Sequence, residues 1–353
     1  MALRQQNQSV PFNGLSIEVP MKWVFIRKWC GVGLSCLCLA MHGCEGTEPE
    51  IDMAGHATDF SQGVFEGEEV DGKRHGTGSM KWMSGDQYEG EWDQGYMQGL
   101  GAMTFANSDT YDGEWQQGYF HGKGEYRWQD GAQYSGEYRQ GERVGYGMYR
   151  FADGKVYEGF FSADQPNGRG TLKLSDGTQI AGEFKDGAIV GEGRILFANQ
   201  EEYFGKIKQN KPHGEGVYRW PDGQIYTGNF KDGKRHGKGE EIWPTGEKYT
   251  GEYQENVQHG HGVIEFPDKS RYEGEFVNGV RQGEGAYLWL DGRRYDGDFA
   301  KGLLDGQGEM RWADGSRFKG PFKSNQIQGV GQCFQPNSQL GIRCWLDNGE
   351  LRG

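Results

Sequence analysis

Basic residues, cysteine, proline and histidine are scarce in this chain. The 353 residues include six Cys, ten Pro and eight His, with 38 Lys and Arg against 51 Asp and Glu. A Gly-x-Ser-x-Gly elbow and a phosphate-binding loop are both missing from the sequence, so hydrolytic and nucleotide chemistry lack their usual residues. Because nucleic acids and anionic lipid headgroups favour basic patches, we expect no nucleic-acid binding, and direct binding of anionic lipids is disfavoured.

The N-terminal part has an apolar run at residues 29–41, about 13 residues long, whereas a membrane-spanning helix needs about 20. Basic residues from Lys22 to Lys28 precede this run and Gly43-Cys44 follows it, a pattern typical of a secretory signal peptide. Residues 1–20 carry no signal features, which favours Met21 as the true start. We therefore interpret residues 1–43 as a polar preamble plus a signal peptide, with a transmembrane anchor as the alternative.

The residues around Cys44 resemble the lipobox of bacterial lipoproteins, in which the cysteine becomes N-terminal and lipid-modified. The resemblance implies Cys44 as the lipidation site and a place in the bacterial periplasm or outer membrane. Met41 and His42 depart from the usual lipobox residues, so ordinary cleavage and secretion stay open. Residues 44–64 are short and acidic, as in a flexible tether. Removing residues 1–43 deletes four basic residues and one acidic residue, leaving 34 basic against 50 acidic.

Glycine and aromatic residues are plentiful and recur with a period of 23 residues. The chain has 62 Gly, 11 Trp, 18 Tyr and 19 Phe. Twelve copies follow one another from Phe65 without insertion or deletion, and the last starts at Phe318. With Tyr111 counted as offset 0, glycine fills offsets 2, 11 and 13 in every copy, and aromatic residues dominate offsets 0, 4 and 17. Such self-similarity predicts a repeat architecture.

Each copy predicts a β-hairpin, since apolar and polar residues alternate in two short segments separated by a glycine-containing loop. Strand alternation places offsets 0, 2 and 4 on one face, together with offsets 11, 13, 15 and 17. We expect the glycines to be bare sockets on which rings of an adjoining strand stack between successive copies. Glutamates at offset 3, such as Glu114, should face water. Dipeptides such as Asp130-Gly131 predict tight turns between copies.

The segments "YEGEW", "HGKGEYRW" and "DG" at this period resemble the MORN repeat, the membrane occupation and recognition nexus motif. The resemblance covers residues 65 to about 335. It implies an all-β, elongated, single-layer stack of antiparallel β-hairpins used for scaffolding, dimerisation or membrane apposition. We assign residues 65–340 to the array and residues 341–353 to a C-terminal cap, with no room for a catalytic domain.

The function expected from these features is binding rather than catalysis. We predict a non-enzymatic, exported, membrane-tethered scaffold for a protein partner or for self-association; a carbohydrate- or phospholipid-binding module of the cell envelope is the alternative. Histidines recur at offset 10 without a neighbouring Cys or carboxylate at ligand spacing, so we expect no metal and no cofactor. Cys333 and Cys344 are candidates for a disulfide that closes the C-terminal edge. The interaction-face candidates are Trp92, Trp115, Trp128, Trp220, Trp243, Trp289 and Trp312.

Overall fold

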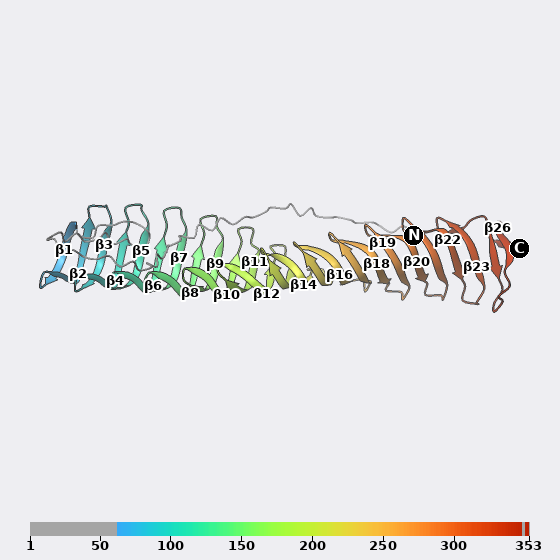
Figure 1. Cartoon of the computed structure of the whole chain (residues 1–353), viewed down its shortest axis with the longest axis horizontal. Coiled ribbons are helices and arrows are strands. Elements are labelled where there is room, and N and C mark those ends of the chain that lie inside the picture. Colours follow the sequence, from blue (N-terminus) through green and yellow to red (C-terminus); the bar gives the residue numbers. More distant parts are fainter. Residues whose placement is uncertain (1–61, 348–349, 353) are drawn as a thin grey trace, which may run out of the picture.

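The computed structural model describes residues 62–347 and 350–352, and all regular secondary structure in these ranges is β-strand. Strands β1 to β23 follow one another in a single sheet, each antiparallel to the next. Figure 1 shows one long layer with the first and last strands at opposite ends. The predicted single-layer stack of hairpins is therefore confirmed.

The strands of the first six copies have similar lengths from copy to copy. Their bounds are β1 Gly63–Val70, β2 Lys73–Trp82, β3 Gln87–Asp93, β4 Tyr96–Thr104, β5 Thr110–Gln116, β6 Tyr119–Arg127, β7 Gln133–Arg139, β8 Glu142–Arg150, β9 Val156–Ser162, β10 Gln165–Lys173, β11 Gln179–Lys185 and β12 Ala188–Leu196.

The remaining strands repeat this pattern of lengths as far as β23, and shorter strands follow at the C-terminal end. Their bounds are β13 Glu202–Lys208, β14 Lys211–Arg219, β15 Ile225–Lys231, β16 Lys234–Ile242, β17 Lys248–Gln254, β18 Val257–Glu265, β19 Arg271–Val277, β20 Val280–Leu288, β21 Arg294–Ala300, β22 Leu303–Arg311, β23 Arg317–Lys323, β24 Gln326–Ile327, β25 Val330–Phe334, β26 Ile342–Asp347 and β27 Glu350–Arg352.

Two turn types alternate along the sheet, and tight turns at the Asp-Gly dipeptides link successive copies, as predicted. Inside a copy, Gln117 and Gly118 have φ values of 51° and 81° and join two paired residues, which is the geometry of a two-residue type I′ turn. Between copies, Gly131 has φ 89° and its N–H donates to the carbonyl oxygen of Trp128, while Asp130 is not left-handed. The Asp-Gly dipeptide thus ends a three-residue loop rather than forming the type I′ turn. The Asp130 carboxylate accepts the Ala132 N–H at 3.0 Å and stabilises this loop.

A β-bulge interrupts the alternation in the second strand of the copy. Gly113 pairs with Gly124, but the next residue, Glu114, pairs with His121. The two residues between them in β6, Gly122 and Lys123, therefore have no paired residue in β5. Gly122 takes φ 55° there, a conformation that side chains rarely adopt. The expectation that offsets 11 and 13 continue one simple face was wrong, because the bulge changes the register between them.

The offset-3 glutamates cap this bulge instead of only facing water. Glu114 accepts the main-chain N–H of Lys123 at 2.9 Å. Glu91 makes the same hydrogen bond with Leu100 at 3.0 Å. In both copies the carboxylate lies over the bulge glycine, Gly122 or Gly99. The acidic column is therefore structural, since it satisfies an amide that the bulge removes from the strand ladder.

The rings at offset 0 lie over the two glycines of their own copy. A Cβ added to Gly113 would approach the Tyr111 hydroxyl oxygen to 2.7 Å and the Gly124 Cα to 2.5 Å. No side chain fits there. The sockets predicted between successive copies are thus filled within each copy. The ring hydroxyl of Tyr111 then donates to the main-chain oxygen of Glu114 at 2.8 Å. Equivalent hydrogen bonds are donated by Tyr88, Tyr134, Tyr157, Tyr203, Tyr226, Tyr249, Tyr272 and Tyr295.

Contacts between copies are edge-to-face ring pairs. Most offset-0 rings contact the offset-4 ring of their own copy and that of the next copy, as Tyr111 does with Trp115 at 5.1 Å and with Tyr138 at 5.4 Å. This arrangement suits the charge distribution of aromatic rings. The rings are almost fully buried, so they form the core that a single hairpin could not build alone.

The C-terminal end departs from the repeat. The second strand of the twelfth hairpin is divided into β24 and β25, both paired with β23, and β26 and β27 then extend the sheet. Cys333 in β25 and Cys344 in β26 form a disulfide with an S–S distance of 2.07 Å. The two cysteines are diagonal neighbours, because Cys333 pairs with Ile342 and Cys344 pairs with Gly331.

Candidate interaction face

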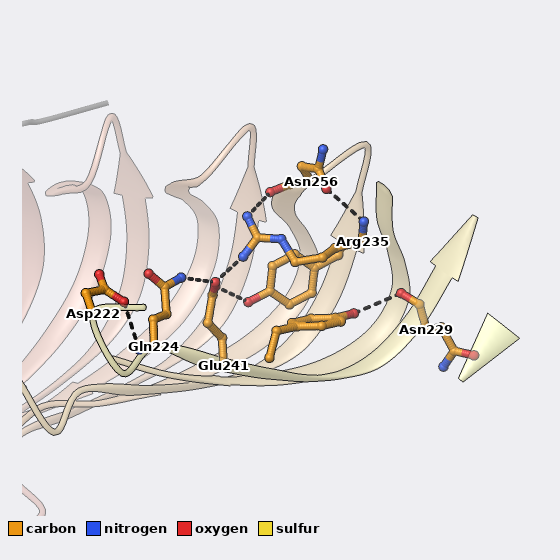
Figure 2. A network of polar contacts seen from close by, with 8 residues as sticks. Asp222, Gln224, Asn229, Arg235, Glu241 and Asn256 are labelled. Carbon is orange, nitrogen blue, oxygen red and sulfur yellow. Dashed lines mark hydrogen bonds and ion pairs between the residues drawn. The ribbon is translucent and has the colours of Figure 1, made fainter. Parts of the chain in front are cut away.

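The face of the sheet that carries offsets 0, 4, 9, 15 and 17 is called the inner face here. It holds the whole aromatic core. Figure 2 shows the sheet curving around side chains of this face. Trp82 and Phe105 at offset 17 are buried, but from the third copy onward the rings at this offset cap the core and are only partly buried: Trp128, Phe151, Phe197, Trp220, Trp243, Phe266, Trp289 and Trp312. They give the inner face a row of accessible aromatic edges, a residue type that contributes strongly to protein interfaces.

Four arginines at offset 9 reach across these rings. They are Arg74, Arg143, Arg235 and Arg281. The guanidinium of Arg143 lies 5.8 Å from the Trp128 ring centre and 5.3 Å from that of Tyr149. Arg235 lies 5.5 Å from the centre of Trp220. Each arginine therefore combines a cation–π contact with a position on the inner face. The sequence pattern does not mark this column, since the other copies carry Gln258 or apolar residues at offset 9.

The most extensive polar network surrounds Glu241, whose side chain is 3% exposed (Figure 2). Arg235 forms an ion pair with this carboxylate, and Gln224 donates to it at 2.6 Å. The Tyr253 hydroxyl donates to the second carboxylate oxygen at 2.7 Å. Burial and the nearby charge of Glu241 raise the pKa of the Glu247 carboxyl. A buried carboxylate is thus paired with one cation and accepts hydrogen bonds from two neutral donors.

Turn residues of the following copy add a second link to these arginines. The Asp164 carboxylate accepts both the main-chain N–H of Arg143 at 2.9 Å and its Nε at 3.1 Å. Asn256 accepts the main-chain N–H of Arg235 at 2.8 Å and, through its main-chain oxygen, a hydrogen bond from Nη2 at 2.8 Å. Both turn residues are at offset 7, where most copies have glycine. The inner face is therefore cross-linked from copy to copy by polar contacts as well as rings.

The predicted tryptophan set divides into two groups. Trp92 and Trp115 are only 4% exposed, and their Nε1 atoms donate to the main-chain oxygens of Gly78 and Gly101. For these two the interaction-face prediction was wrong, because offset 4 lies inside the ring stack. Trp128, Trp220, Trp243, Trp289 and Trp312 are partly buried and line the inner face. They stay candidates. Cys44 and the remainder of the predicted signal lie outside the described residues.

A groove lies beside the disulfide at the C-terminal end of the array. It has a volume of about 690 Å³ and is lined in part by Trp312, Phe334, Arg293, Arg317 and the two cysteines. The charged residues here are largely paired within the chain, since Arg293 contacts Asp291 at 2.7 Å and Arg317 lies 3.6 Å from Glu309. Within residues 62–347 and 350–352, no side-chain cluster has the composition of a metal site and no helix could cross a membrane.

Comparison with protein families matches the MORN repeat eleven times in tandem, over residues 60–87, 88–110, 111–133, 134–156, 157–179, 181–201, 203–225, 226–248, 249–271, 272–292 and 295–317. The chain belongs to the MORN-repeat family. The twelfth hairpin, which starts at Phe318, continues the MORN array beyond the matched residues with the divided second strand described above. Comparison with curated proteins finds no match in sequence.

Solved structures give only distant similarity. The TCP domain of SAS-4 (dCPAP) of Drosophila melanogaster, in complex with a proline-rich motif of Ana2, has 15% identity and a TM-score of 0.29, with 52% of this chain and 89% of that chain covered. The TCP10 domain of Danio rerio CPAP with a STIL peptide has 14% identity and a TM-score of 0.29, with coverage of 77% and 98%. A streptogramin B lyase reaches 12% identity and a TM-score of 0.14, with coverage of 75% and 88%.

Proposed function

We propose that this MORN array is an exported, membrane-tethered scaffold that holds a protein partner on its inner face and performs no catalysis. Family membership supports a repeat scaffold for protein or membrane interaction. The observation that carries the protein-binding proposal is the row of half-buried rings at offset 17, which runs alongside arginines on the same face. Aromatic and arginine side chains are the residue types enriched in the energetically important centres of protein interfaces.

The opposite face supports the choice of the inner face. It carries the offset-3 carboxylates, which are engaged by main-chain amides of the bulges. Their negative charge disfavours an anionic membrane surface on that side. Membrane association is therefore assigned to the lipid anchor proposed at Cys44, and partner binding to the rings.

Site-specific photo-crosslinking tests the binding face. A benzophenone side chain at Trp289 points to the inner face, whereas one at the adjacent Leu288 lies on the opposite face, where Leu288 is 41% exposed. We expect irradiation to give a protein adduct from the position 289 variant and much less from the position 288 variant. Equal adducts from both positions contradict the proposal, and an adduct removed by glycosidase treatment replaces it with the carbohydrate-binding alternative.

Cell fractionation tests the tether separately. Wild-type chain and the Cys44→Ala variant are expressed in the same bacterial host and compared in membrane and soluble fractions. We expect the wild-type chain in the membrane fraction and the variant in the soluble fraction, because the variant has no thiol for lipid attachment. Membrane association that is unchanged in the variant rejects the lipid anchor while leaving the crosslinking result intact.

A further inference from the structure

The inner-face arginines differ in how their charge is balanced. Arg143 has Asp164, and Arg235 has Glu241. Arg281 has no carboxylate within ion-pair distance among residues 62–347 and 350–352. Its hydrogen bond runs from Nη2 to the main-chain oxygen of Gly302 at 2.8 Å. A half-buried cation without a counter-charge is costly.

The space around Arg281 shows where a carboxylate is missing. Gly302 is the offset-7 turn residue that corresponds to Asp164 beside Arg143 and to Asn256 beside Arg235. A Cβ added to Gly302 would meet only Val280 at 3.9 Å and Arg281 Nη2 at 4.0 Å within 4 Å, which is ordinary contact. The position that a carboxylate occupies beside Arg143 is therefore open beside Arg281.

The main chain adds a donor to the same space. Arg143, Arg235 and Leu304 each donate their main-chain N–H to the side chain of the offset-7 residue in the next copy. The hairpin pairing of Arg281 with Phe276 repeats the pairing of Arg235 with Phe230, so the Arg281 N–H faces the same gap. Glycine offers it no side-chain acceptor. A guanidinium and an amide N–H thus converge on one open position, which suits a carboxylate oxygen.

Aromatic rings border this position. The Arg281 guanidinium lies 5.4 Å from the centre of Tyr272, 5.5 Å from that of Tyr287 and 5.8 Å from that of Phe299. Tyr287 and the neighbouring Trp289 are only partly buried. Burial lowers the pKa of the Arg281 guanidinium, as expected for a cation held among rings. The rings exclude water from one side and strengthen the attraction of an incoming negative charge.

Arg74 provides an instructive comparison at the other end of the array. It also faces a glycine turn, Gly95, and lies over the rings of Phe65 and Trp92. Burial lowers the pKa of Arg74, but the charge of Glu69, which pairs with Arg74 across β1 and β2, opposes this shift. Among the four arginines in the described part of the chain, Arg281 therefore has the least balanced charge.

From this comparison we infer that Arg281 and Gly302 form a receptor for an Asp or Glu side chain on an acidic segment of the protein partner. The inference rests on the proposed function and adds the chemistry of the partner at one point of the inner face. The carboxylate takes the place that Asp164 occupies beside Arg143. Ring contacts with Tyr287 and Trp289 hold the residues next to it. At physiological salt, charges more distant than about 8 Å are largely screened, so the net negative charge of the chain does not prevent this local contact.

Peptide binding to the full chain tests the inference. The probe is a fluorescein-labelled ten-residue peptide of alternating Glu and Ser, compared with the same peptide carrying Gln for Glu, by fluorescence anisotropy at physiological salt. We expect the wild-type chain to bind the Glu peptide and not the Gln peptide. Arg281→Gln should weaken binding by about tenfold or more, since one side of a desolvated charge pair is removed.

Two glycine variants provide matched controls. Gly302→Asp should supply the missing carboxylate from within the chain, because Asp164 has φ 67° at the equivalent position and Gly302 has φ 80°. It should therefore remain folded and lose binding of the Glu peptide. Gly279→Asp introduces the same charge at the same turn position, φ 78°, but beside Gln258 instead of an arginine. It should retain binding.

Several outcomes overturn the inference. They are the absence of Glu-dependent binding to the wild-type chain at millimolar peptide, equal binding by the Arg281→Gln variant, and equal loss in the two aspartate variants. Circular dichroism of each variant separates lost binding from lost folding, and Arg281→Gln decides the matter if Gly302→Asp does not fold. Photo-crosslinking of a partner that survives Arg281→Gln rejects this receptor but leaves the inner-face scaffold standing.

Discussion

Two long runs of stacked rings differ from the sixth copy, which lies between them. The N-terminal run links Phe65 to Phe184 and the C-terminal run links Tyr203 to Phe322 through edge-to-face pairs. The sixth copy has Ile180 at offset 0, and the seventh has Ile207 at offset 4. Both isoleucines are buried, and this boundary has no edge-to-face pair between offsets 0 and 4; it keeps only a tilted contact between Phe197 and Tyr218, with ring centres 5.6 Å apart. The same strand pairing is therefore supported by two kinds of core.

The glycine sockets show the same contrast. In ring copies the glycine pair leaves no room for a Cβ, because the tyrosine ring and the facing backbone occupy it. At Gly182 the nearest obstacle is the terminal Cδ1 of Ile189 at 2.9 Å, and the facing backbone begins at 3.3 Å. Glycine is thus required at both positions beside a ring. In the sixth copy it is less required at Gly182, whereas a Cβ on Gly193 would still meet the Ala181 main-chain oxygen at 2.7 Å. In a repeat protein, stability is approximately the sum of copies and their interfaces, so the boundary without an edge-to-face pair between offsets 0 and 4 should be the weakest internal one.

Alkaline pH should have the largest effect on the ring runs. Burial raises the pKa of Tyr157, Tyr203 and Tyr272 to about 12, against about 10 in an unfolded chain. The folded state therefore holds protons that the unfolded state loses, and stability that is complete below pH 10 is lost as pH rises toward 12. Absorbance at 295 nm and circular dichroism should report tyrosine ionisation and unfolding together. Ionisation of these tyrosines near pH 10 with unchanged dichroism would count against burial of the stack.

Substitution of alanine for glycine at offset 2 should destabilise a copy with a ring at offset 0 more than the copy with an isoleucine there. Gly113→Ala is expected to lower the free energy of unfolding by about 3 kcal/mol, because the ring and the facing backbone cannot both move away. Gly182→Ala should cost about 1 kcal/mol or less, since the end of the Ile189 side chain can adjust. Urea unfolding of both variants measures the difference. Equal losses would show that the ring is not what demands glycine.

Removal of one ring hydroxyl should have a smaller effect. Tyr249→Phe deletes the hydrogen bond from the ring hydroxyl to the Glu252 main-chain oxygen, 2.9 Å in length. We expect a loss of about 1 kcal/mol in the free energy of unfolding. Tyr96→Phe is the control, because Tyr96 is 56% exposed outside the stack. A loss as large as that of Gly113→Ala would assign the main role to the hydroxyl rather than to the ring.

Replacement of a glutamate that caps the bulge should have the smallest effect on the free energy of unfolding. Glu114→Gln keeps an oxygen acceptor for the Lys123 N–H but removes its charge, so we expect a loss of about 0.5 kcal/mol in unfolding free energy. Glu89→Gln, exposed on the same face, should change nothing measurable. Copy five has Phe160 in place of the cap, which shows that the bulge tolerates its absence. A loss above that of Tyr249→Phe would contradict this ranking.

Much of the fold could be predicted because the period places like residues at like positions. Strict spacing from Phe65 onward implies equal hairpins, and alternation indicates which offsets share a face. The bulge could not be predicted, because it depends on how two strands pair: only the register shows that Glu114 meets His121 and that its carboxylate reaches the Lys123 amide. The burial of Trp92 and Trp115 could not be predicted for the same reason, because it also depends on how the strands pair. Residue type alone marks these tryptophans as interface residues.

The arginine column was hidden for a different reason. Arginine fills offset 9 in four copies, so it does not stand out as a column beside the invariant glycines. Its meaning emerges only when each guanidinium is placed next to the turn of the following copy. There the choice of Asp164, Asn256 or Gly302 decides whether the charge is balanced within the chain.

Hydrogen exchange with mass spectrometry tests most directly whether edge-to-face rings hold the copies together. We predict that amides of β11 to β14, on either side of the boundary between Ile180 and Ile207, exchange before those of β7 to β8 and β17 to β18. That interface lacks the edge-to-face pair between offsets 0 and 4, worth about 1 kcal/mol, and keeps only the tilted contact of Phe197 with Tyr218. Uniform exchange along the array, or the slowest exchange at β11 to β14, would contradict this prediction.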